Sequence, residues 1–238
     1  MKLTSKISRL LLLFIFLGST VAIADVDKDK DKKKQQSAGV LSKSESACAT
    51  GSALAFLDVN NVRASLYNTG GLFWKGSGNV YTVPKTGRAN AIFASGIWLG
   101  GMVGDELRMA GTTYGPFEFF PGPLDDNGNP PADCSPYDRI FIITKQDLQD
   151  FDAGEPHTAD IEDWPWELGA PVADGDGDST NYNLAGGDRP GIIGDQTAWW
   201  VMNDAAGVHG TTQSAPVGLE VQVTAFAFRR ADALNNTT

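Results

Sequence analysis

Short apolar segments separated by Gly, Asn, Asp and Pro make up most of residues 53–228. The clearest of them is 217–228, in which Leu219, Val221 and Val223 alternate with polar residues. Strict alternation is typical of a strand with one buried face. No helical periodicity persists and no strand–helix alternation recurs. We therefore expect a mainly β fold, a sandwich or jelly-roll-like pair of antiparallel sheets with long Pro/Gly/Asp-rich loops.

Three other segments indicate strands that are buried more completely. The continuous apolar run 91–99 predicts a strand covered on both faces, although Gly96 interrupts it. Residues 139–144 are rich in β-branched and aromatic side chains and predict a second buried strand. Because neighbouring side chains on a strand face opposite sides, the pair Trp199 and Trp200 predicts a sheet with both faces covered.

Two segments break the β pattern. A short helix is expected at 145–151, where Thr144 can cap the first turn and Asp147 stands at the position of a capping-box acid. A single helical turn is expected at 158–163.

The stretch 116–136 carries six prolines, so it cannot form regular structure, and a loop of this length is usually functional or tied down.

The N-terminus has the pattern of a secretory signal peptide. Residues 1–24 combine three basic residues, an eight-residue apolar run at 10–17 and a small-x-small site ending at Ala24. The alternative, a membrane anchor, needs about 20 apolar residues. Residues 25–39 alternate Asp with Lys and predict a solvated tether. We expect cleavage after Ala24 and a secreted or cell-surface protein with no transmembrane segment in the mature chain.

Charge is distributed unevenly along the chain. The whole sequence carries a formal net charge of −10, but the signal peptide contributes +3 and the tether +1. Residues 40–238, expected to form a single β-rich extracellular domain, therefore carry −14. Such a surface attracts divalent cations and argues against nucleic acid as a partner.

Residues 174–178, Asp-Gly-Asp-Gly-Asp, form the strongest metal-binding pattern, because alternate carboxylates on a flexible loop can converge on Ca²⁺. The EF-hand pattern fails, since Ser179 stands at its glycine position and Ala185 at its glutamate position. The alternative is an acidic surface turn. A second acidic segment, 125–129, favours an ordinary turn over a weak cation site. The predicted calcium ligands are Asp174, Asp176, Asp178 and Asp188, with Asn181 and Asp195 as further oxygen donors.

The chain has two cysteines, Cys48 and Cys134. In an exported protein they meet an oxidising compartment, so a disulfide between them is chemically allowed. It would join the N-terminal segment to the Pro-rich loop. Free reactive thiols are the alternative, but neither cysteine has a basic neighbour in the sequence that would activate it.

Aromatic residues admit two interpretations. Exposed Trp and Phe beside carboxylates would form a carbohydrate-binding cleft, whereas the commoner arrangement places them in the core of a sandwich. No nucleophile elbow, zinc-protease spacing or phosphate-binding loop occurs. The 25 acidic residues after position 39 offer many pairs of carboxylates, and the sequence does not identify any one of them as catalytic. No enzyme activity is therefore expected. The aromatic residues concerned are Trp74, Trp98, Phe117, Phe119, Phe120, Trp164, Trp166, Trp199 and Trp200.

Seven segments in fixed order resemble the N-terminal region of large secreted or surface proteins of Bacteroidota-type bacteria. Those proteins are exported by the type IX system and usually end in a C-terminal sorting domain. The resemblance implies a β-rich extracellular module with no catalytic residues to transfer. The segments are VNNVRASLYNTGGLFW (59–74), VPKTGRANAIFASGIWLGG (83–101), FFPGPLDDNG (119–128), YDRIFIITKQDL (137–148), IEDWPWELGAPVADGDGD (161–178), DRPGIIGDQTAWWVMND (188–204) and GLEVQVTAFAF (218–228).

The sequence thus predicts a secreted or cell-surface, non-enzymatic module with an adhesion or scaffold role, stabilised by calcium. Its expected partners are other surface or matrix components or glycans. The alternative is a carbohydrate-binding or glycoside-processing protein that uses the Trp-rich loops and acidic clusters. Because similar proteins continue far beyond the strand at 217–228, we expect the domain to be truncated at its C-terminal end. That strand would then expose an edge that promotes association.

Overall fold

The computed structural model describes residues 48–75, 78–79, 81–112 and 114–230, all within one compact unit of the chain, Lys43–Thr238. The predicted signal peptide 1–24, the tether 25–39 and the C-terminal residues 231–238 lie outside the described residues. The expectation of a mainly β fold is confirmed, because the described chain consists of antiparallel strands with one α-helix.

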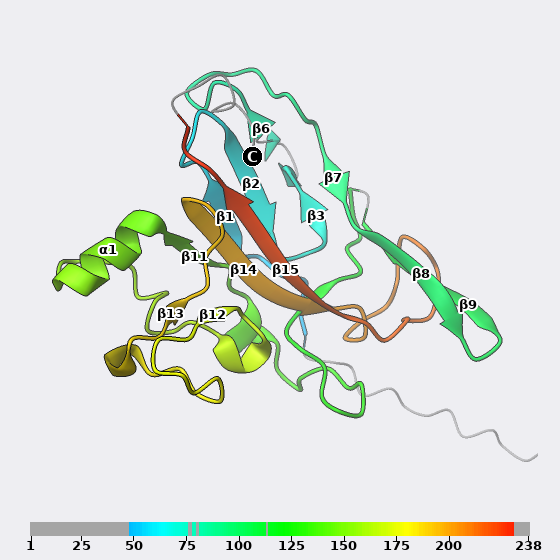
Figure 1. The fold of residues 1–238 in the computed structure, drawn as a ribbon. Coiled ribbons are helices and arrows are strands. Elements are labelled where there is room, and N and C mark those ends of the chain that lie inside the picture. Colours follow the sequence, from blue (N-terminus) through cyan, green and yellow to red (C-terminus); the bar gives the residue numbers. More distant parts are fainter. Residues whose placement is uncertain (1–47, 76–77, 80, 113, 231–238) are drawn as a thin grey trace, which may run out of the picture. The chain divides into compact units, whose positions relative to one another are not determined.

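Two sheets form the layers of a sandwich-like fold (Figure 1). The strands of the first sheet follow the order β1-β2-β3-β7, with β6 also paired to β2: β1 (Leu54–Leu57), β2 (Arg63–Tyr67), β3 (Gly71–Leu72), β6 (Tyr81–Thr82) and β7 (Ser95–Gly96). The second follows the order β10-β14-β11, with β15 also paired to β14: β10 (Phe120–Pro121), β11 (Phe141–Thr144), β14 (Gln196–Asn203) and β15 (Glu220–Ala227).

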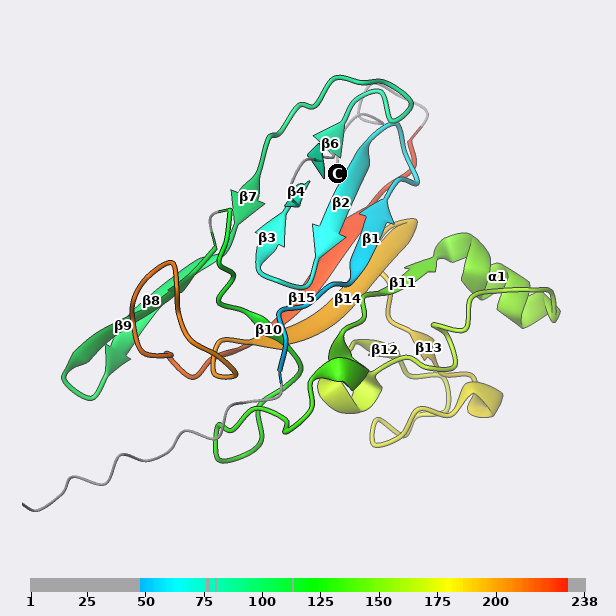
Figure 2. The ribbon, with the colours of Figure 1, turned by 180° about the vertical axis from the view of Figure 1, so that it is seen from behind.

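Three two-stranded ribbons complete the β structure of the described residues. They are β4 (Trp74–Lys75) with β5 (Gly78–Asn79), β8 (Trp98–Val103) with β9 (Glu106–Gly111), and β12 (Val172–Ala173) with β13 (Arg189–Pro190). Seen from behind, the first sheet lies in front of β14 and β15, and the β8–β9 ribbon extends away from both sheets (Figure 2). This arrangement leaves the β12–β13 ribbon and α1 on the other side of the second sheet (Figure 1).

Strand β14 is the centre of the core, since all eight of its residues are buried. The prediction from Trp199 and Trp200 is confirmed. Trp200 packs with Leu57, Leu66 and other residues between the sheets, whereas Trp199 packs with a second cluster on the opposite face. Burying an aromatic side chain on each face stabilises both layers by a few kcal/mol each.

Helix α1 (Lys145–Ala153) confirms the helix predicted at 145–151, and its capping box is present. The Thr144 side chain accepts a hydrogen bond from the Asp147 N–H, and the Asp147 carboxylate accepts one from the Thr144 N–H. Gly154 ends the helix in the left-handed conformation with a φ of 74°. In the part of the chain that the structure describes, short 3₁₀ segments lie at Ser135–Tyr137, Trp166–Leu168 and Leu184–Gly186.

The alternation expected in 217–228 is present in β15. Val221 and Val223 pack against the core between the sheets, while Gln222 bonds to the Leu168 carbonyl on the other face. The prediction for Leu219 is wrong: it precedes the strand and is 36% exposed. Its N–H is instead held by the Asp204 carboxylate at 2.6 Å. Within the described residues β15 pairs with β14 alone, so its other edge carries no strand.

The predicted doubly covered strand at 91–99 is also wrong. Residues 91–94 lie outside any strand, the rest of the run contains β7 and the start of β8, and Phe93 and Trp98 are 58% and 52% exposed. Gly96 lies against the Thr112 backbone, where a Cβ would come within 2.5 Å of the carbonyl oxygen. Trp98, Met102 and Leu107 lie on the same face of the β8–β9 ribbon and are exposed, so this face of the ribbon remains open.

A disulfide joins Cys48 to Cys134 across 86 residues. Asp138 reinforces this connection, because its carboxylate accepts hydrogen bonds from the Ser52 backbone and hydroxyl and from the Asn68 amide. The Pro-rich stretch 116–136 is therefore tied down, as expected of a long loop in a compact domain. The expectation that it forms no regular structure is wrong at β10, because Phe120 and Pro121 pair with β14.

Among the described residues, no helix has the length and apolar content needed to cross a membrane.

Candidate functional site

The β12–β13 ribbon brings two distant acidic residues to the same place. Val172 pairs with Pro190 and Ala173 pairs with Arg189 in antiparallel register. Asp174 is the next residue after β12, and Asp188 is the last residue before β13. The two carboxylates therefore emerge side by side at one end of the ribbon, although 14 positions separate them in the sequence.

The loop after β12 is shaped by its own side chains. Asp174 accepts a hydrogen bond from the Gly177 N–H at 2.6 Å, and Asp176 accepts one from the Asp178 N–H at 2.9 Å. These local bonds are typical of Asp in tight turns. At Gly175 the backbone passes so close to Gly187 that a Cβ would lie 2.3 Å from its carbonyl oxygen. Glycine at 175 is what allows the loop to approach Asp188.

Three of the four predicted metal ligands come together. Carboxylate oxygens of Asp174, Asp176 and Asp188 all lie within 4.8 Å of one another, and we call these residues the three-carboxylate group. Asp188 is buried, whereas Asp174 and Asp176 are exposed. Asp178 stands outside the group, because its carboxylate accepts hydrogen bonds from the N–H and hydroxyl of Thr180.

Hydrogen bonds favour the ionised form of Asp188. The backbone N–H groups of Asn183 and Gly175 donate to its two carboxylate oxygens and hold the pKa of Asp188 below its usual value. The neighbouring Arg189 pairs with Asp152 at 2.6 Å. Within the described residues no basic side chain forms an ion pair with the three-carboxylate group, although the Arg189 guanidinium donates to the Asp188 backbone carbonyl at 2.6 Å.

A pocket of about 250 Å³ adjoins the three-carboxylate group. One side is apolar and formed by Trp166, Ala170 and Val172. The other side is polar and includes Asp174, which therefore belongs to both the pocket and the group. We call this cavity the Trp166 pocket, and its remaining lining residues are Asp178, Ser179 and Asn181.

The tryptophans separate into core and surface positions. Trp164, Trp199 and Trp200 are almost completely buried, as the core interpretation expects. Trp166 is half-buried, packs against the cluster around Trp199 and lines the pocket, while Trp98 is exposed on β8. The structure thus brings one tryptophan, not two, to the acidic segment 174–178.

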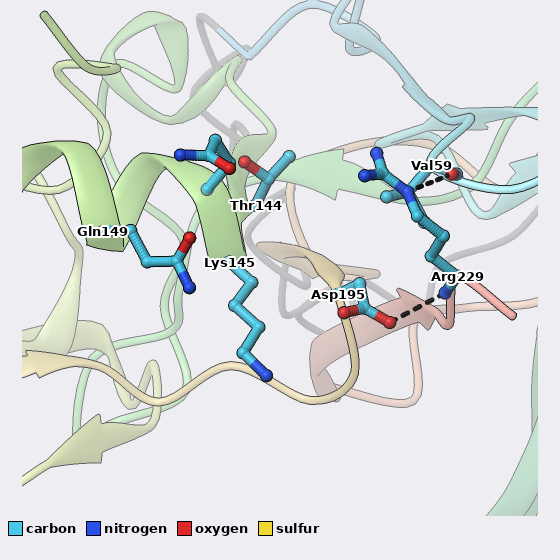
Figure 3. Close-up of a pocket in the computed structure, with 7 residues that line it drawn as sticks. Val59, Thr144, Lys145, Gln149, Asp195 and Arg229 are labelled. Atoms are coloured by element: carbon cyan, nitrogen blue, oxygen red, sulfur yellow. Dashed lines mark hydrogen bonds between the residues drawn. The ribbon is translucent and has the colours of Figure 1, made fainter.

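A second pocket of about 300 Å³ lies where α1 begins, and its lining includes Lys145, Asp195 and Arg229. Figure 3 shows the charged ends of Lys145 and Arg229 pointing away from each other. The Arg229 guanidinium donates to the Val59 carbonyl, and the Arg229 N–H donates to Asp195. Asp195, expected as a further metal ligand, is therefore engaged away from the three-carboxylate group.

The second acidic segment is an ordinary turn. Asp125 accepts hydrogen bonds from the N–H groups of Asn127 and Asn129, and Gly128 N–H donates to the Asp125 carbonyl. These bonds hold the pKa of Asp125 below its usual value, with Asn129 as the main cause. Segment 125–129 therefore needs no ion to explain its conformation.

A buried polar cluster was not foreseen from the sequence. Glu118, Asp204 and His209 are all fully buried, and the ring nitrogens of His209 lie 2.7 Å and 2.8 Å from the carbonyl oxygens of Met109 and Asp204. Each carboxylate also accepts several backbone N–H groups. About 90 residues separate Glu118 from His209, so no local sequence pattern predicts the contact.

Fold and site together define an antiparallel β-sandwich-like domain with a group of three carboxylates that could hold a metal ion. Comparison of the chain with protein-family models, with curated proteins and with solved structures gave no match.

Proposed function

We propose that the chain is an exported, non-enzymatic surface module in which the three-carboxylate group binds Ca²⁺. The observation that carries this proposal is the convergence of Asp174, Asp176 and Asp188 within 4.8 Å, without a basic side chain paired to them in the described structure. Like charges held this close repel one another unless a cation lies among them. Binding a cation would therefore stabilise the folded loop.

Calcium fits the group better than other common metals. All three side chains offer oxygen, which hard cations prefer, and the loop contributes no His or Cys for zinc or copper. Ca²⁺ accepts six to eight oxygens in variable geometry, so carbonyl groups and water can complete its shell. The turn from Asp174 to Gly177 can supply such carbonyl groups.

Export is supported by the disulfide between Cys48 and Cys134, because such bonds persist in oxidising compartments outside the cytosol. The signal-peptide pattern of residues 1–24 and the resemblance to type IX-exported proteins point in the same direction. The proposed adhesion or scaffold role is supported by the open β8–β9 face, which offers apolar contact area. We expect N-terminal sequencing of the exported protein to begin at Asp25.

Calcium binding is tested by thermal unfolding with 2 mM Ca²⁺ (about millimolar, as outside cells) and with a chelator. The midpoint of the wild-type protein should rise by several degrees with Ca²⁺, and Asp176→Asn should abolish the rise. Asp126→Asn is the matched control, since this exposed residue lies in the other acidic segment. An equal midpoint with calcium and with chelator would refute the proposal.

A carbohydrate-related function remains the second candidate, because the Trp166 pocket places an indole beside acidic residues. The arrangement lacks the second tryptophan that an open Trp-lined groove would need, since Trp164 is buried.

A further inference from the structure

We propose that strand β8 (Trp98–Val103) pairs with β8 of a second copy of this chain, with a two-fold axis at Gly100. The inference rests on the scaffold role proposed above and names the partner of the β8–β9 ribbon, but it does not depend on calcium. Three observations carry it: the outer edge of β8 has free backbone groups, the strand is uncharged, and an antiparallel copy of the strand matches it.

One edge of β8 is turned toward β9 and the other is turned away from it. The Met109 N–H on β9 donates to the Ser214 hydroxyl and its carbonyl accepts from the Thr212 hydroxyl, so these backbone groups point away from β8. Opposite residues of an antiparallel pair either bond to each other or both point outward. Gly100 is opposite Met109, so its N–H and C=O point outward, and alternation gives Met102 the same orientation.

This outer edge of β8 is open. Within the described ranges β8 pairs with β9 alone, and the outward groups of Gly100 and Met102 have no hydrogen-bond partner there. Gly100 is exposed, and Figure 2 shows the ribbon extending away from both sheets. The Trp98 indole leans over Gly111 of its own ribbon and donates to the Thr112 carbonyl at 3.0 Å, so it leaves the edge uncovered. An open edge is a template for another strand.

The edge lacks the features that usually prevent pairing, which are charge, proline and bulges. Residues 89–104 contain no charged residue and no proline, and β8 pairs with β9 one residue to one. On β9, Glu106 and Arg108 form an ion pair with each other at 3.1 Å. Because residues 40–238 carry a net charge of −14, two copies can meet closely only at an uncharged surface. Strand β8 provides such a surface.

An antiparallel copy of β8 fits this edge when Gly100 lies on the two-fold axis. Gly100 is then opposite the partner's Gly100, while Trp98 is opposite the partner's Met102 and the reverse pair forms by symmetry. All these residues direct their backbone groups outward, so each pair can exchange two hydrogen bonds. Trp98 and Met102 share the open face of the ribbon, and a thioether beside an indole is a favourable contact. The edge is therefore complementary to itself.

The dimer should be weak and should be favoured by salt. Strand β8 contributes only six residues from each copy, which places the interface among the small ones that form transient complexes. Both copies are acidic, so repulsion between them opposes association, and added salt screens that repulsion. We expect a monomer–dimer equilibrium at micromolar concentration that shifts toward the dimer as the salt concentration rises.

Sedimentation velocity of the purified protein and two variants tests the pairing. Gly100→Pro removes the N–H donor on the axis and should abolish the dimer, whereas the monomer tolerates proline on an edge whose N–H faces solvent. Gly100→Ala is the matched control, because it keeps the N–H and its Cβ meets no atom closer than 3.5 Å. Its dimer should match that of the wild type.

Cysteine cross-linking tests the register and does not require Gly100→Pro to fold. Gly100→Cys places the two added thiols opposite each other, with Cα atoms about 5.5 Å apart, which suits a disulfide. Met102→Cys is the matched control, since its two copies would lie about 13 Å apart along the strands. Cys48 and Cys134 are already bonded to each other, so the added thiol is the one that reacts. Mild oxidation should give a covalent dimer with Gly100→Cys and not with Met102→Cys.

Each result decides the proposal. A wild-type protein that stays monomeric at micromolar concentration in high salt overturns it and leaves the edge to a strand of a different protein. A dimer that survives Gly100→Pro, or that cross-links better through Met102→Cys, overturns it as well. A salt-favoured dimer without any calcium-dependent midpoint overturns calcium binding alone, and a calcium-dependent midpoint in a strictly monomeric protein overturns the β8 pairing alone.

Discussion

The Nδ1 atom of His209 lies 3.8 Å from a carboxylate oxygen of Glu118, and both side chains are completely inaccessible to solvent. Asp204 lies at the same distance from the opposite nitrogen of the ring. The two ring nitrogens of His209 also lie within hydrogen-bond distance of the carbonyl oxygens of Met109 and Asp204. The cluster connects the end of β9 to the segment 204–219 and thereby holds the base of the β8–β9 ribbon.

Glu118→Gln should destabilise the protein by about 3–5 kcal/mol, as expected when one member of a buried charged group is neutralised. The Glu118 carboxylate accepts from the N–H groups of Gly111, Thr211 and Thr212, and an amide would turn its own N–H groups toward some of these donors. Urea unfolding measures the loss. Glu106→Gln on exposed β9 is the control and should change stability by less than about 0.5 kcal/mol.

Glu118 should also contribute to acid unfolding. Burial alone would raise its pKa, but hydrogen bonds from Thr212, Gly111 and Thr211 lower it below the ordinary value of 4.5. A carboxyl with a lowered folded-state pKa stabilises fully above the unfolded-state value and loses that contribution as pH falls toward the folded-state value. Stability measured from pH 7 to pH 3 should therefore fall more steeply below pH 4.5 in the wild type than in Glu118→Gln. An equal dependence of stability on pH below pH 4.5 in the wild type and in Glu118→Gln would contradict this prediction.

Removing the disulfide with Cys48→Ala and Cys134→Ala should lower the free energy of unfolding by about 4–5 kcal/mol in the chain-entropy model, because the bond closes a long loop. The loop spans 86 residues and includes β1 and most of the Pro-rich stretch. Chemical denaturation of the wild type with and without reductant provides the matched comparison. Equal midpoints for all three samples would show that Asp138 and its hydrogen bonds hold the segment without the disulfide.

Gly175→Ala should reduce both the thermal midpoint and its response to calcium. The added Cβ would meet the Gly187 carbonyl oxygen at 2.3 Å, and neither backbone can move without separating Asp174 from Asp188. Overpacking of this kind costs about 1–3 kcal/mol. Gly100→Ala is the control, because the nearest atom there is 3.5 Å away. A calcium response unchanged by Gly175→Ala would place the ion elsewhere.

The open face of the β8–β9 ribbon should cause self-association at micromolar concentration. Trp98, Met102, Leu107 and Met109 lie on one face in register, and Met102 and Leu107 are each more than 60% exposed. Exposed apolar patches of this kind favour association. Leu107→Lys should shift sedimentation velocity profiles toward the monomer, and Val208→Lys, at an exposed position outside the ribbon, should not. A wild-type protein that is already monomeric would refute the prediction.

Patterns within a few residues were sufficient to predict the local elements. The capping box at Thr144 and Asp147 uses groups three positions apart, and the alternation in β15 depends on the two-residue period of a strand. Adjacent Trp199 and Trp200 predicted a sheet covered on both faces for the same reason, and both are buried in separate clusters. The antiparallel β class and the acidic loop at 174–178 could also be predicted from such local patterns.

Contacts between distant segments were decided by the tertiary structure. The register of β12 with β13 places Asp188 beside Asp174 and leaves Asp178 outside, and no local pattern encodes that register. The exposure of Trp98 depends on which strands cover β8, and the Glu118–His209 contact depends on how segment 204–219 returns to β9. By itself the sequence determined periodicity, turns and charge, because these arise from neighbouring residues. Packing across the whole chain decides which carboxylates meet, which tryptophan faces a pocket and which apolar face stays open.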